Sequence, residues 1–86
     1  PSRDKVLKVD VFCDSTCEMA FTLEDAVTGE MYRYTQNVIG GVWQSLVLKS
    51  KLFKTVNGTP LSDYSHNVRF CVSCEGKYAI NNVMWL

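Results

Sequence analysis

Four cysteines, arranged as two close pairs, are the residues of this sequence best suited to chemistry. Cys13 and Cys17 lie near the beginning of the chain, and Cys71 and Cys74 lie near its end. Such a set can bind zinc through four thiolates, act as a redox-active Cys-x-x-Cys centre, or form two disulfide bonds. Zinc ligands usually come in pairs close together in sequence, whereas the 53 residues between Cys17 and Cys71 look like folded sheet.

A redox centre of the thioredoxin type needs its first thiol at the N-terminus of a helix, where the thiol pKa falls. The segment NVRFCVSCEGKYAI, residues 67–80, is instead typical of two strands joined by a turn. In an extended chain Cys71 and Cys74 would lie about 10 Å apart, beyond the roughly 7 Å limit for a disulfide. The sequence therefore favours disulfides that join the two ends of the chain in an oxidising compartment, with no metal or other cofactor.

The elements that must position these cysteines are strands. Apolar and polar residues alternate with a period of two, as in Leu7, Val9 and Val11 against Lys8 and Asp10. Strands of this kind are predicted over residues 5–13, 17–26, 31–38, 42–50, 68–73 and 77–86. Turn signals separate the strands, and no helix is expected. The pattern predicts one all-β domain over residues 1–86, an antiparallel β-sandwich of about six to eight short strands in jelly-roll order, stapled by disulfides.

The composition narrows the class of partner. Nine basic and nine acidic residues give a formal net charge of zero, whereas a nucleic-acid binder normally carries a basic surplus. No apolar run approaches the roughly 20 residues that a membrane-spanning helix needs. We therefore expect no nucleic-acid partner and no membrane insertion. The chain begins at Pro1, which we interpret as the start of a mature product or an excised module, with residues 1–4 a flexible start.

A further pattern runs through residues 40–86. Trp43 opens a strand that contains Leu46 and Leu48, Phe53 follows, Leu61 and Asp63 lie in a loop, and the chain ends in Ile80-Asn81-Asn82-Val83-Met84-Trp85. In these motifs the sequence resembles carbohydrate-binding modules with the galactose-binding-domain-like jelly roll, and the resemblance covers roughly Leu7 to the end. It implies a secreted, non-catalytic domain that binds a polysaccharide or glycan, tethered to a larger enzyme or a cell-wall protein.

The resemblance also implies a topology. The first strand would pair with the last strand and with the Trp43 strand, and the second would pair with the third and with residues 68–73. That arrangement gathers all four cysteines at one end of the sandwich, and it implies the disulfides Cys17–Cys71 and Cys13–Cys74. Larger modules of this kind often hold a structural calcium ion near additional strands; the residues for such a site are not recognisable here, and no cofactor is expected.

The sugar site implied by the resemblance is the exposed face of the second, third and fifth strands. Sugars bind there through flat aromatic rings and planar polar side chains. The candidates are Glu24, Tyr32, Arg33, Tyr34, Gln36 and Arg69. The side chains of the third strand, residues 31–38, can be oriented in two alternative ways. Either Tyr32, Tyr34 and Gln36 face outward as a stripe, or Arg33 faces outward beside Arg69 and both tyrosines join the core, which the cost of burying a charge favours.

Other residues are expected to be structural. Trp43 is predicted to lie in the core, and Asn81 and Asn82 are predicted to hydrogen-bond to neighbouring backbone. An enzyme is not expected, because no serine lies in a nucleophile motif and the single histidine, His66, has no obvious companions. The alternative function is an extracellular protein-interaction or structural β-sandwich domain without sugar binding. Burial of both tyrosines beneath a face without ligands would favour that alternative.

Overall fold

The computed structural model describes residues 6–61 and 68–86. The expected flexible start at residues 1–4, Asp63 of the loop motif and His66 lie outside the described residues. The elements of the described part are β1 (Val6–Cys13), β2 (Cys17–Asp25), β3 (Met31–Val38), β4 (Gln44–Lys49), the 3₁₀ helix η1 (Ser50–Leu52), β5 (Val68–Ser73) and β6 (Tyr78–Trp85). No helix among these elements is long and apolar enough to cross a lipid bilayer.

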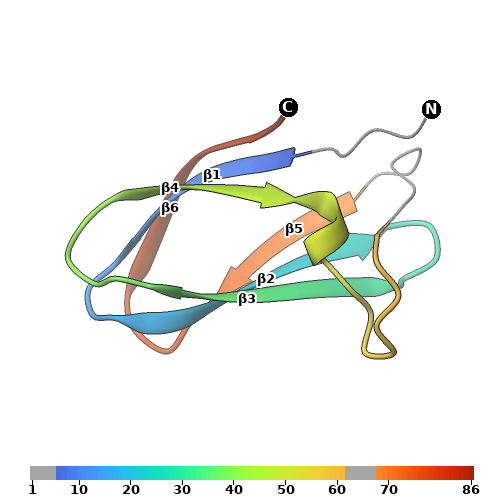
Figure 1. The fold of residues 1–86 in the computed structure, drawn as a ribbon, viewed down its shortest axis with the longest axis horizontal. Coiled ribbons are helices and arrows are strands. Elements are labelled where there is room, and N and C mark those ends of the chain that lie inside the picture. Colours follow the sequence, from blue (N-terminus) through green and yellow to red (C-terminus); the bar gives the residue numbers. More distant parts are fainter. Residues whose placement is uncertain (1–5, 62–67) are drawn as a thin grey trace.

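The strands form two antiparallel three-stranded sheets, with the orders β4-β1-β6 and β3-β2-β5 (Figure 1). This is the strand pairing that the resemblance implies, and the all-β prediction is confirmed. The apolar faces of the two sheets are turned toward each other, which gives a β-sandwich-like architecture. Such layering follows from the alternation of the strands, because each sheet has one apolar face that must be removed from water.

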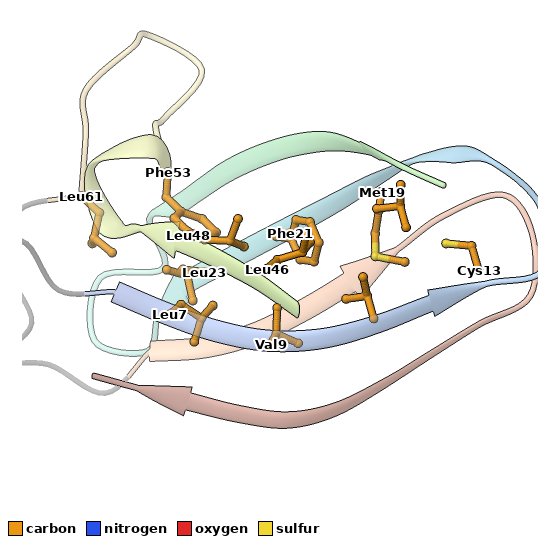
Figure 2. Packing of buried hydrophobic residues seen from close by; sticks show 12 residues of the cluster. Leu7, Val9, Cys13, Met19, Phe21, Leu23, Leu46, Leu48, Phe53 and Leu61 are labelled. Carbon is orange, nitrogen blue, oxygen red and sulfur yellow. The ribbon is translucent and has the colours of Figure 1, made fainter. Parts of the chain in front are cut away.

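The core lies between β1 and β2. Along β1 the side chains of Leu7, Val9 and Cys13 point inward and are at most 1% exposed. Figure 2 shows these residues facing Met19, Phe21 and Leu23 of β2, with Leu46 and Leu48 of β4 beside them. Burial of one such side chain stabilises the fold by about 1.5–3 kcal/mol.

The connection after β4 closes one side of this core. Phe53, which follows η1, is 0% exposed, and its ring lies 6.1 Å from the ring of Tyr34. The backbone N–H of Leu61 donates to the carbonyl of Phe53 at 2.9 Å, so both apolar side chains are inserted from one loop. Lys54 in the same loop bridges to Arg33, which adds a short extra pairing beside β3.

Candidate functional site

The direction of the side chains of β3 is resolved in favour of the second reading. Arg33 is exposed, whereas Tyr32 and Tyr34 pack against the buried core. The Tyr34 ring stacks 6.5 Å from the Phe21 ring, and its hydroxyl donates to Oε1 of Gln36 at 3.0 Å. The stripe of Tyr32, Tyr34 and Gln36 as an outward binding surface is therefore absent, because the two rings fill the space between the sheets.

The remaining predicted residues do share the outer face of sheet β3-β2-β5. Arg33 lies opposite Thr22, and Arg69 lies opposite Glu24. The Arg69 guanidinium is 3.7 Å from the Glu24 carboxylate, an exposed ion pair of small energetic value. The structure thus brings Glu24, Arg33 and Arg69 to one face as a polar platform that contains none of the predicted aromatic rings.

A hollow of about 600 Å³ lies on this platform, at the end nearest the start of β2. Ala20 of β2 is paired with Ser73 of β5, and both line the hollow. Their small side chains leave space above the sheet. Arg33 lines one side, and the other lining residues are Thr16, Cys17, Glu18, Cys74 and Glu75. Among the described residues, charges of both signs and no aromatic side chain line this space, so they offer no stacking surface for a sugar ring.

A second hollow, on the outer face of sheet β4-β1-β6, does contain an aromatic ring. We call it the Trp43 hollow; it measures about 170 Å³ and is lined by Asp10, Trp43, Gln44, Ser45 and Asn81. The Trp43 side chain is 56% exposed, so the prediction that it lies in the core is wrong. Its ring leans against Phe12 of β1, with the ring centroids 5.7 Å apart at 40°.

The alternation of β4 explains this placement. Leu46 and Leu48 are buried, so Ser45 and Val47 must face outward, and Trp43 falls on the same side by period two. The tight turn before β4 then holds the ring in place. Gly41 adopts a φ of 85° that favours glycine, and its N–H donates to the Cys13 carbonyl at 2.7 Å.

The polar side of the Trp43 hollow is built around Asp10. The Ser45 hydroxyl donates to its carboxylate at 2.6 Å, and the Asn82 amide donates at 2.8 Å. These two hydrogen bonds, in that order, hold the pKa of Asp10 below its usual value, so the carboxylate is ionised near neutral pH. Asn81, as predicted, bonds to neighbouring backbone by accepting from the Asn82 N–H at 2.9 Å, whereas the Asn82 side chain reaches Asp10 instead.

Three of the four cysteines meet at one end of the molecule. The Cys17 sulfur lies 3.3 Å from that of Cys13 and 3.0 Å from that of Cys74, and all three sulfurs are within 4.8 Å of one another. Burial, followed by the neighbouring Cys17, raises the pKa of the Cys13 thiol to about 12. The Cys17 contact is the main cause that raises the pKa of Cys74. All four cysteines are free thiols in this structure.

The predicted Cys17–Cys71 disulfide is wrong, because Cys71 is held elsewhere by the register of the sheet. Cys71 pairs with Thr22, five residues along β2 from Cys17. At about 3.4 Å per residue this separation is roughly 17 Å, far beyond disulfide reach. Cys71 is also exposed. The predicted Cys13–Cys74 pair is close in space but not bonded, and that bond remains a prediction.

Comparisons with known proteins assign no relative to this chain. No protein-family model, no curated protein sequence and no solved structure matches it.

Proposed function

We propose that the chain is a non-catalytic carbohydrate-binding module that binds a polysaccharide or glycan in the Trp43 hollow. The observation that carries the proposal is an exposed indole ring set beside a carboxylate, two amides and a hydroxyl. The CH face of a pyranose stacks on such a ring, while its hydroxyl groups donate to the ionised Asp10 and exchange hydrogen bonds with Gln44 and Asn81.

The size of the hollow suits one sugar ring. Its volume of about 170 Å³ is below the roughly 300–1,000 Å³ of enclosed small-molecule pockets. A chain end, or one unit of a chain lying across the sheet, fits an open site of this kind. The proposal includes secretion, since wall polysaccharides lie outside the cell. It also includes the jelly-roll order of the strands. Sugar binding of this kind requires no disulfide.

The proposal is tested with the folded domain against plant and fungal wall polysaccharides, by affinity electrophoresis and then by calorimetry. We expect Trp43→Ala to weaken binding by about fivefold, because stacking on an aromatic ring is worth on the order of 1 kcal/mol. Val47→Ala on the same face should bind normally, since Val47 lies outside the hollow. A wild-type domain that binds none of these polysaccharides contradicts the proposal.

The second candidate is a protein-interaction or structural domain. Tyr32 and Tyr34 are partly buried against the core, which favours it for the face of sheet β3-β2-β5, where the described residues present no stacking ring. Arg33→Ala separates the two faces as sugar sites, because it alters the face of sheet β3-β2-β5 and leaves the Trp43 hollow intact. Loss of sugar binding in this variant, with Trp43→Ala unaffected, would move the sugar site to the Arg33 platform.

A further inference from the structure

The three-cysteine cluster is not used by the proposed sugar site. Cys13 is the last residue of β1, Cys17 is the first of β2, and Cys74 directly follows β5. Sulfur atoms from the ends of three strands, one in sheet β4-β1-β6 and two in sheet β3-β2-β5, therefore lie close together at this point. Cys13 is 0% exposed, whereas Cys17 and Cys74 line the hollow of about 600 Å³ and can be reached from solvent.

A disulfide bond cannot engage all members of the cluster, because the cluster has three sulfurs and a disulfide uses two. A bond between any two of the three cysteines leaves the third thiol crowded against it. The fourth cysteine cannot bond to that thiol, because Cys71 faces solvent about 17 Å along the sheet from Cys17 and about 10 Å from Cys74, beyond disulfide reach of either. A metal ion, in contrast, engages all three sulfurs at once.

The spacing of the sulfurs fits a tetrahedral ion. Zinc binds thiolates at about 2.3 Å, which places the sulfurs of one site roughly 3.8 Å apart. The three sulfurs here lie within 4.8 Å of one another. The shortest pair, at 3.0 Å, would open by about 0.8 Å on binding. The open side toward solvent leaves a fourth position for water.

We infer that Cys13, Cys17 and Cys74 of the reduced protein together bind one zinc ion. Thiol protons are released to solvent as the thiolates become ligands, and no electron is transferred. The ion then links the end of β1 to β2 and to the residue after β5, so it fastens one sheet to the other. This site is separate from the proposed sugar site, and either assignment can fail without the other.

The test uses the reduced, metal-free full chain titrated anaerobically with Co²⁺ and then Zn²⁺. One equivalent of Co²⁺ should give a sulfur-to-cobalt charge-transfer band in the near ultraviolet, and Zn²⁺ should abolish it. Cys17→Ser and Cys74→Ser should weaken binding by more than about 100-fold, since even outer-shell changes cost 10–100-fold. Cys71→Ser is the matched control and should bind normally.

Alkylation of the unmodified chain keeps the test independent of whether a variant folds. With Zn²⁺ bound, iodoacetamide followed by mass spectrometry should label Cys71 and spare the other three cysteines. The inference is overturned if the reduced chain gives no charge-transfer band, if the band survives in Cys74→Ser, or if Zn²⁺ leaves the labelling pattern unchanged.

Discussion

Asp10 is a single side chain that connects all three strands of its sheet. It extends from β1 and accepts hydrogen bonds from Ser45 of β4 and from Asn82 in the middle of β6. Asn82 adopts a φ of 52°, which is unusual for a residue other than glycine, at the irregular part of the β1–β6 pairing. The contact with Asp10 offsets part of the cost of that backbone conformation.

The lowered pKa of Asp10 predicts that the stability of the fold depends on pH in acidic solution. Its folded pKa is lower than the ordinary value of 3.8, because of the bonds from Ser45 and Asn82 and the charge of Lys8. Its contribution to the free energy of unfolding is therefore complete above pH 3.8 and disappears as the pH falls through the lower folded pKa. Asp10→Asn should reduce stability at neutral pH and converge with the wild type in strong acid.

Urea unfolding at several pH values, followed by tryptophan fluorescence, checks this expectation. Glu30→Gln is the control, since Glu30 is exposed in the β2–β3 turn. A constant stability difference between Asp10→Asn and the wild type at every pH would contradict the role given to the Asp10 carboxylate.

At the level of elements, alternation alone was enough to predict β1 and β2, whereas their pairing partners were implied by the resemblance to carbohydrate-binding modules. The same rule places Trp43 outward with Ser45 and Val47, whereas the prediction of a core position rested on the resemblance to carbohydrate-binding modules. Alternation did not determine which β3 side chains face inward, because Tyr32, Tyr34 and Arg33 each combine an apolar body with a polar tip. Tyr34 packs against Phe53, which enters from the loop after β4 and could not be placed from the β3 sequence.

The position of Cys71 could not be predicted from its own neighbourhood. Its distance from Cys17 depends on the register of β5 against β2, which places Cys71 opposite Thr22. A strand register is fixed by the side chains of a whole face, and a shift of one residue would turn every side chain of β5 over. The gathering of Cys13, Cys17 and Cys74 followed from the predicted pairing, whereas the exclusion of Cys71 needed the register.

The turn between β1 and β2 meets the turn before β4 at Gly40. A Cβ atom at Gly40 would lie 2.4 Å from the backbone of Ser15 and Thr16, and the Gly40 N–H donates to the Thr16 hydroxyl at 3.0 Å. Gly40→Ala should separate the turns, lower the free energy of unfolding by about 1–3 kcal/mol and weaken sugar binding.

Val42→Ala, in the same turn but 50% exposed, is the matched control for Gly40→Ala. It should change stability by less than about 0.5 kcal/mol. Equal unfolding midpoints for the two variants in urea would show that the turns tolerate a methyl group between them.

For the whole molecule, the distribution of buried side chains is uneven. Along β1 every second residue is buried, whereas all of β6 is exposed, including Ile80 and Met84. The side of the sandwich beside β3 and β4 is closed instead by Phe53 and Leu61 from one loop (Figure 2). A domain of 86 residues has little stability in reserve, about 5–15 kcal/mol, so this closure accounts for a large share of it.

Phe53→Ala should therefore come close to unfolding the domain. Removal of a buried phenylalanine costs about 3–5 kcal/mol, and here it also removes the ring that packs 6.1 Å from Tyr34. Leu52→Ala changes the adjacent residue, which is 37% exposed, and should cost far less. Guanidinium unfolding of both variants measures the difference. If Phe53→Ala were as stable as Leu52→Ala, the loop would not close the core.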